Sequence, residues 1–139
     1  MRKLLLLAAV LLTATACVEQ KGDGLYMYSQ EVDSPSSAWT LDGDHYVTYS
    51  EVPQITKTVC DIGTVNVYMY IDNKTQVALP YTRHYTEKVD GEWVDYTQTI
   101  DFEYTHSPGG IYFFITNSDF VYTSPMPEGN YYFRVVMTW

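Results

Sequence analysis

Three histidines and two neighbouring carboxylates are the side chains of this sequence best suited to metal or acid–base chemistry. His45, His84 and His106 are the only histidines, and no two of them have the four-residue spacing with which a helix presents two ligands to one metal ion. Asp101 and Glu103 share one face of a predicted strand, but nothing around them predicts the desolvation that would separate their pKa values. We therefore expect no metal, no cofactor and no catalytic residue, and a carboxylate-dependent hydrolase is the weakest alternative.

The aromatic content is the one unusual feature of the composition, with 14 tyrosines and three tryptophans among 139 residues. Aromatic rings that are exposed on a sheet can stack on sugar rings, while their polar atoms reach hydroxyl groups. Aromatic residues also favour strands for packing reasons alone, because they pair with one another across neighbouring strands. If some of them bind a ligand, the candidates are Trp93, Tyr68, Tyr70 and Tyr132.

The strands that would position these side chains begin at Trp39. From there the sequence alternates Tyr, Thr, Val and Ile between regularly spaced turn residues, which is typical of antiparallel strands. We expect about seven or eight strands in an all-β, immunoglobulin-like antiparallel sandwich over residues 39–139, with a small closed β-barrel as the alternative. One short helical turn is predicted near residues 54–61, opened by Pro53 and closed by Gly63.

The dipeptide Asp90-Gly91 predicts a β-hairpin with a two-residue type I′ turn. Such a turn sets the register of the two strands, so Lys88 is expected opposite Trp93. The hairpin then has one apolar face and one polar face, and Trp93 lies on the polar one. The apolar face is expected to meet the core and consists of Tyr81, Tyr85, Val89, Val94, Tyr96 and Ile100.

Composition and charge exclude one class of partner. A chain of 139 residues is long enough for one domain with a single core. The formal net charge is −9, and it becomes −11 without residues 1–16, which hold two of the eight basic residues and none of the 17 acidic ones. Binding to nucleic acid needs clustered Lys and Arg to neutralise phosphates, so we expect no nucleic-acid partner.

The first 17 residues, MRKLLLLAAVLLTATAC, have the pattern of an export signal. Arg2 and Lys3 precede an apolar segment, residues 4–12, that is much shorter than the roughly 20 residues of a membrane-spanning helix. The end of the signal resembles the lipobox of bacterial lipoproteins, whose cysteine is acylated and becomes the first residue of the mature chain. The Ala-Thr-Ala sequence of residues 14–16 also fits ordinary secretory cleavage, and both patterns cut before Cys17.

These features divide the chain into three predicted parts. Residues 1–16 form a lipoprotein signal peptide, residues 17–38 a lipidated Cys17 with a flexible tether, and residues 39–139 the sandwich domain. About 20 flexible residues would reach roughly 25 Å, which clears the lipid headgroups. If Cys17 carried no lipid, a disulfide with Cys60, the only other cysteine, would be the competing arrangement.

The sequence also resembles a group of small uncharacterised surface lipoproteins of the Bacteroidetes. The similar segments are residues 52–70 (VPQITKTVCDIGTVNVYMY), 79–81 (LPY) and 133–136 (FRVV). In that group, a segment with the pattern I-T-x-x-V-x-D-x-G-x-V-x-V-Y leads into a sheet, and the chain ends soon after an F/Y-R-V-V strand. Acidic residues directly after the cysteine, here Glu19 and Asp23, resemble export signals of surface-exposed lipoproteins in the same phylum. The resemblance implies a β-sheet fold and a location in the cell envelope, and it supplies no binding or catalytic residue.

The function expected from these patterns is that of a non-catalytic lipoprotein of the cell envelope, whose sandwich serves as a binding or assembly module. Its partners would be the membrane, through lipid on Cys17, and a protein or a glycan. The expected location is the outer membrane, with either the periplasmic or the outer face exposed. The alternative function is a glycan-binding surface lipoprotein that uses exposed Tyr and Trp side chains.

Overall fold

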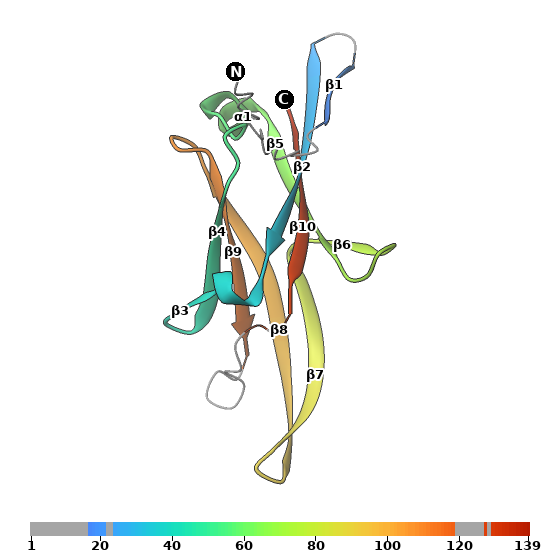
Figure 1. Cartoon of the computed structure of the whole chain (residues 1–139), viewed down its shortest axis with the longest axis vertical. Helices are drawn as coiled ribbons and strands as arrows, with labels where there is room; N and C mark the ends of the chain where they lie inside the picture. The colour runs from blue at the N-terminus through green and yellow to red at the C-terminus, as the bar shows by residue number, and fades with distance from the viewer. Residues whose placement is uncertain (1–16, 22–23, 119–126, 128) are drawn as a thin grey trace, which may run out of the picture.

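The computed structural model describes residues 17–21, 24–118, 127 and 129–139, and it shows an antiparallel β-sandwich (Figure 1). Among these residues, ten strands form two five-stranded sheets. Sheet A has the order β1-β2-β10-β5-β6, and sheet B has the order β3-β4-β9-β8-β7. The predicted sandwich is confirmed, and the two sheets do not close into the alternative barrel.

The bounds of the elements are as follows. Sheet A contains β1 (Cys17–Lys21), β2 (Leu25–Ser34), β5 (Thr64–Tyr70), β6 (Gln76–Ala78) and β10 (Tyr131–Thr138). Sheet B contains β3 (Thr40–Asp42), β4 (His45–Glu51), β7 (Tyr81–Val89), β8 (Glu92–Thr105) and β9 (Gly110–Asn117). A 3₁₀ turn, η1 (Ser36–Ala38), and a short helix, α1 (Lys57–Ile62), lie in the connections.

The order of the strands is distinct from that of an immunoglobulin domain. In an immunoglobulin constant domain, the sixth of seven strands lies between the third and the seventh. Of the seven long strands here, the sixth is β9, and it lies between β4 and β8. Domain size and turn spacing predicted the sandwich correctly, but they carry no information on which distant strands pair.

The core fills the space between the two sheets, because alternate side chains of each strand point inward. Phe113 of β9 and Phe133 of β10 stack across this space with ring centroids 3.9 Å apart, and both are fully buried. Val67 of β5 and Val135 of β10 are also buried in this layer. Each side chain of this size contributes about 1.5–3 kcal/mol when it is fully buried, so this layer stabilises the central strands of both sheets.

Residues 17–21 and 25–34 are strands, which corrects the flexible tether predicted for residues 17–38. The backbone of β1 pairs with β2 from Cys17 opposite Ser29 to Lys21 opposite Leu25, and β2 pairs with β10 along its length. Composition hid this strand because its inward positions mix apolar and polar residues, so the period of two was not visible. Those positions are Tyr28, Gln30, Val32 and Ser34. The predicted signal peptide, residues 1–16, lies outside the described residues.

The hairpin of β7 and β8 has the predicted register, with Lys88 opposite Trp93. Asp90 and Gly91 have φ angles of 49° and 89°, as a type I′ turn requires. Of the face that was predicted to meet the core, however, only Ile100 is fully buried, and the other members are half-buried. The reason is that β9 pairs with β8 only from Gln98 onward.

The remainder of this hairpin, residues 84–97, extends beyond the sandwich as a two-stranded ribbon, which we call the arm. In Figure 1 the arm lies at the opposite end of the molecule from α1 and the C-terminus. Its inner face carries Tyr85 and Tyr96, whose rings stack with centroids 5.2 Å apart. Cross-strand aromatic pairs of this kind stabilise a ribbon that has no sheet on either side.

Helix α1 corresponds to the helical turn predicted near residues 54–61. The hydroxyl of Thr56 accepts a hydrogen bond from the backbone N–H of Val59, so Thr56 is the N-cap and the helix starts after the predicted opening at Pro53. Gly63 closes the helix, as predicted. Cys60 is half-buried against the core and has a free thiol. Among the described residues, no helix has the length and apolar character needed to cross a membrane.

Candidate functional site

Three of the four aromatic candidates lie on one surface, the outer face of sheet A. Tyr68 and Tyr70 project outward from β5, and Tyr132 projects outward from the neighbouring strand β10. The register of the two strands pairs Tyr68 with Arg134 and therefore places Tyr70 beside Tyr132. Trp93 lies far from them near the tip of the arm, on the other sheet.

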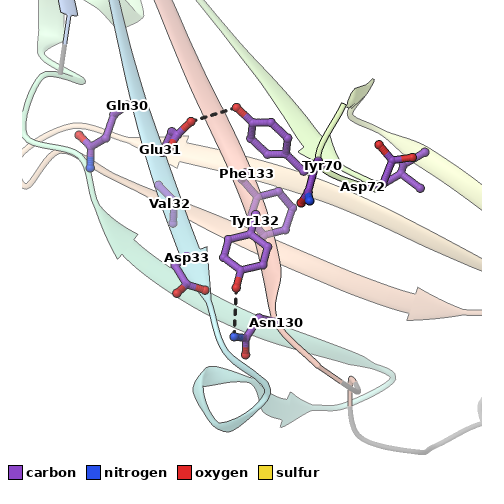
Figure 2. Close-up of a pocket in the computed structure, with 11 residues that line it drawn as sticks. Gln30, Glu31, Val32, Asp33, Tyr70, Asp72, Asn130, Tyr132 and Phe133 are labelled. Atoms are coloured by element: carbon purple, nitrogen blue, oxygen red, sulfur yellow. Dashed lines mark hydrogen bonds between the residues drawn. The ribbon is translucent and has the colours of Figure 1, made fainter. Parts of the chain in front are cut away.

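A pocket of about 850 Å³ lies on this face, between β2, β10 and the end of β5 (Figure 2). We call it the sheet A pocket. Its lining combines two tyrosine rings with carboxylates and amides, and none of the described residues that line it is Lys or Arg. The lining residues with polar side chains or tyrosine rings are Gln30, Glu31, Asp33, Tyr70, Asp72, Asn73, Asn130 and Tyr132.

Hydrogen bonds hold both tyrosines of the pocket in place, as Figure 2 shows. The hydroxyl of Tyr70 donates to Oε1 of Glu31 at 3.0 Å, which links β5 to β2 across the face of β10. Nδ2 of Asn130 donates to the hydroxyl of Tyr132 at 3.3 Å. Tyr70 is thus oriented by a partner from β2, and Tyr132 by Asn130, which directly precedes its own strand. Such fixed rings lower the entropy lost when a ligand binds.

The protonation states in the pocket follow from these contacts. Burial raises the pKa of Tyr70, and the hydrogen bond to Glu31 raises it further, so its hydroxyl stays protonated at neutral pH. The backbone N–H groups of Lys74 and Thr75 each donate to Oδ1 of Asp72 at 2.7 Å and lower the pKa of that carboxyl. Asp72 is therefore ionised at neutral pH and adds to the negative charge of the pocket.

Tyr68 lies on the same face as the sheet A pocket but does not line it. The guanidinium carbon of Arg134 lies 4.7 Å from the centroid of the Tyr68 ring, and Nε of Arg134 donates to Oε1 of Gln76 at 2.9 Å. Arg134 therefore covers one face of this ring in a cation–π contact. The structure gives Tyr68 a packing contact in place of an open stacking surface.

Trp93 is the most exposed of the four candidates, at 71% of its accessible surface, on the outer side of the arm. The ammonium group of Lys88 lies 5.9 Å from its ring centroid. A shallow hollow runs along the arm, lined by His84, Thr86, Asp95 and Ser118 among others, but Trp93 does not line it. Trp93 therefore presents a flat and isolated ring.

The residues considered for metal and acid–base chemistry are scattered. His45 bonds to the adjacent Asp44 at 3.0 Å, and His84 and His106 lie on the arm and in the turn before β9. Asp101 and Glu103 are exposed on β8 and do not line the sheet A pocket. Across the part of the chain that the structure describes, no group of three or more His, Cys, Asp or Glu side chains could hold a metal ion.

Sequence reasoning missed the six polar residues of the pocket that are not tyrosines. Gln30, Glu31 and Asp33 fall in the predicted flexible tether, and Asp72, Asn73 and Asn130 were not among the candidates. The mixture of apolar and polar residues at the inward positions conceals β2, and no local signal says that this strand pairs with β10. The carboxylates of the site were therefore beyond prediction, although both tyrosines of the pocket were among the candidates.

Compared with known proteins, the chain matches no protein-family model, no curated protein and no solved structure. The groups gathered in the sheet A pocket are aromatic rings, hydrogen-bond acceptors and amides. Such groups bind molecules that combine an apolar face with hydroxyl or amino substituents.

Proposed function

We propose that this chain is a non-catalytic lipoprotein of the cell envelope and that the sheet A pocket of its sandwich binds a glycan. The observation that carries this proposal is the placement of Tyr70 and Tyr132 side by side, on adjacent strands, in a pocket with a polar lining. A sugar ring has an apolar face that packs on aromatic rings, and its hydroxyls exchange hydrogen bonds with carboxylates and amides. The pocket volume, about 850 Å³, lies within the usual range for small ligands, about 300–1,000 Å³.

The charge of the pocket narrows the class of glycan. Glu31, Asp33 and Asp72 line it without a described Lys or Arg among its residues. A uronic acid or a sulfated sugar would bring a second negative charge against these carboxylates, which costs free energy in a partly desolvated site. The ligand is therefore a neutral glycan or one with free amino groups.

The test uses the detergent-solubilised full-length protein and a panel of neutral, amino-substituted and acidic glycans. The protein is expected to bind members of the first two classes, and Tyr132→Ala is expected to weaken binding about two- to tenfold, because an aromatic stacking contact contributes about 0.5–1.5 kcal/mol. The matched control is Tyr112→Ala, since Tyr112 is an exposed tyrosine on the outer face of sheet B. Binding to acidic glycans alone, or equal binding by both variants, would contradict the proposal.

Anchoring is the second part of the proposal, and the signal-like sequence of residues 1–17 supports it. Since β1 starts at Cys17, acyl chains on that residue would hold the edge of sheet A near the membrane, without a long tether. Two or more acyl chains make such anchoring stable, because each buried methylene contributes about 0.8 kcal/mol. The intact mass of the mature protein tests this step, and a mass without acyl chains would contradict it.

A protein partner is the second candidate function, and the exposed ring of Trp93 on the projecting arm favours it. Exposed tryptophans are frequent centres of protein interfaces. Crosslinking of the anchored protein in its own membrane is expected to recover one reproducible partner, and Trp93→Ala is expected to lower its yield. Recovery of only the bulk envelope proteins would count against this candidate.

A further inference from the structure

Strand β7 forms one edge of sheet B and has β8 as its only partner strand in the described part of the chain. The type I′ turn makes Val89 and Glu92 the first hydrogen-bonded pair of the hairpin, so the odd-numbered residues of β7 bond to β8. The backbone N–H and C=O groups of the even-numbered residues consequently point outward, away from the sheet. These residues are Thr82, His84, Thr86 and Lys88.

Natural sheets protect such an edge with a proline, a bulge, a very short strand or charged side chains. Strand β7 has nine residues, contains no proline, and pairs with β8 without an interruption in register. Its charged residues, Arg83, Glu87 and Lys88, disfavour most strands at this edge but not one whose charges match them. Its outward backbone groups can therefore accept another strand along their whole length, as in recognition by strand addition.

The side chains of β7 are complementary to a second copy of the same strand. In an antiparallel pair centred on Tyr85, Arg83 of each copy lies opposite Glu87 of the other. These positions form non-hydrogen-bonded pairs, in which the Cα atoms are closest, about 4.5 Å apart. On the other face, His84 lies opposite Thr86, so no like charges meet.

The two neighbouring registers lack this complementarity. A shift of the centre to His84 puts Arg83 opposite Tyr85 and leaves Glu87 opposite an aromatic ring. A shift of the centre to Thr86 puts Arg83 opposite Val89 and brings Lys88 next to His84. Only the register centred on Tyr85 pairs each charge on the inner face with an opposite charge, and opposite-charge pairs across strands contribute about 0.2–1 kcal/mol each.

The environment of Arg83 indicates a missing partner. Its Nε atom is buried and has no hydrogen-bond partner among the described residues. Its guanidinium carbon lies 5.8 Å and 6.0 Å from the ring centroids of Tyr81 and Tyr85, which orient the group without accepting its hydrogen bonds. A carboxylate from a second copy would pair with the charge of this guanidinium through its terminal N–H groups.

We propose that two copies of this chain associate through antiparallel pairing of their β7 edges, centred on Tyr85, so that their B sheets become one continuous sheet. The stacked Tyr85 and Tyr96 of each copy then form a row of four rings across the junction. This pairing uses sheet B, so it is independent of glycan binding on the outer face of sheet A.

The register is tested with cysteine crosslinking of the full chain in its own membrane. Tyr85→Cys places two thiols opposite each other, and mild oxidation is expected to give a covalent dimer in high yield. Thr86→Cys is the matched control, because each of its thiols lies opposite His84 and a disulfide would be rare. The parent chain measures the background from the half-buried Cys60. Equal yields from both variants, or none from Tyr85→Cys, would overturn the proposed register.

Charge exchange supplies an independent test that leaves Tyr85 in place. Arg83→Glu puts two carboxylates opposite each other, and Glu87→Arg puts two cations opposite each other. The assay is co-purification of two differently tagged copies of the same variant. For each variant, the yield of the second copy is expected to fall at least tenfold. Co-expression of the two variants is expected to restore pairing, because each Glu then faces an Arg. Circular dichroism confirms that each variant is folded. Single variants that pair like the parent, or a mixture that fails to recover, would overturn the proposal.

Discussion

The outer face of sheet A and the arm both present aromatic rings to solvent. Only on sheet A are these rings flanked by strands on both sides. On sheet A, Tyr132 lies on a strand flanked by β2 and β5, and both flanking strands contribute side chains to the pocket. On the arm, Trp93 has a partner strand on one side only. An exposed aromatic residue therefore becomes part of a site when the strands on both of its sides supply polar groups.

The two regions also differ in what lies beneath them. The residue next to Tyr132 is Phe133, which is fully buried and stacks on Phe113 of the opposite sheet. Within the described ranges, no sheet opposes the arm, and an isolated two-stranded ribbon is only marginally stable in water. We expect the pocket to be rigid and the arm to open locally at a lower free energy, and the following predictions test this difference.

The largest effect is expected from Phe133→Ala, which removes the ring that packs beneath the sheet A pocket. The loss of a fully buried phenylalanine costs about 3–5 kcal/mol, because it removes buried apolar surface and leaves a cavity. Trp93→Ala on the arm is expected to change the free energy of unfolding by less than about 0.5 kcal/mol, as most surface substitutions do. Urea denaturation measures both values. Similar costs for the two variants would show that the arm is packed as tightly as the sandwich.

The next effect in size is expected at the tip of the arm, from Gly91→Ala. Gly91 has a φ angle of 89°, and placing an L residue in this region costs about 1–2 kcal/mol. Amide hydrogen exchange is expected to accelerate about tenfold in residues 84–97, while glycan affinity stays unchanged. Asp90→Asn is the control, because Asn-Gly also favours a type I′ turn. Faster exchange throughout sheet A would mean that the arm and the sandwich open as one unit.

The turn and the register of the hairpin were predicted correctly, because two adjacent residues, Asp90 and Gly91, select the turn and the turn selects the register. The projection of the arm beyond the sandwich was not predicted. The outer face of sheet A depends on β2 pairing with β10, at the other end of the chain. No local pattern encodes that pairing, so Glu31 and Asp33 could not be placed beside Tyr132.

The prediction that the apolar face of the hairpin meets the core was wrong for most of its residues, for a related reason. Alternation along the hairpin correctly separated an inner from an outer side, with Ile100 and Tyr85 both on the inner side. Whether an inner residue is buried depends on the length of the opposing and adjacent strands. Because β9 pairs with β8 only as far as Gln98, Ile100 is buried and Tyr85 is only half-buried.

A smaller difference is expected between the two cation–π contacts. Arg134 lies 4.7 Å from the Tyr68 centroid and also donates to Gln76, whereas Lys88 lies 5.9 Å from the Trp93 centroid. Arg134→Met is expected to destabilise the protein by about 0.5–1 kcal/mol. Lys88→Met is expected to cost less than about 0.5 kcal/mol, because a flexible ammonium at that distance is mostly hydrated. Thermal unfolding of the two variants measures the difference, and the reverse order would contradict the rigidity assigned to sheet A.

The subtlest comparison concerns two tyrosines that each donate to a glutamate, Tyr70 to Glu31 at 3.0 Å and Tyr96 to Glu87 at 3.3 Å. Burial raises the pKa of both tyrosines above the ordinary value of about 10, and the negative charge of each glutamate raises it further. A raised pKa in the folded state favours the protonated phenol. The resulting stability is therefore present below pH 10 and is lost as the pH rises through the folded-state pKa.

The other neighbours of the two tyrosines differ: Arg134 lowers the pKa of Tyr70, whereas Tyr85 and Tyr131 raise the pKa of Tyr96. Glu31→Gln is expected to lower the pKa of Tyr70 and leave Tyr96 unchanged, and Glu87→Gln is expected to do the reverse. Arg134→Gln is expected to raise the pKa of Tyr70 alone. NMR titration of the tyrosine ring carbons, with Tyr→Phe variants at both positions for assignment, measures each value. A single substitution that shifts the pKa values of both tyrosines would mean that the sheet A pocket and the arm are electrostatically coupled. That result would contradict their separation in the structure.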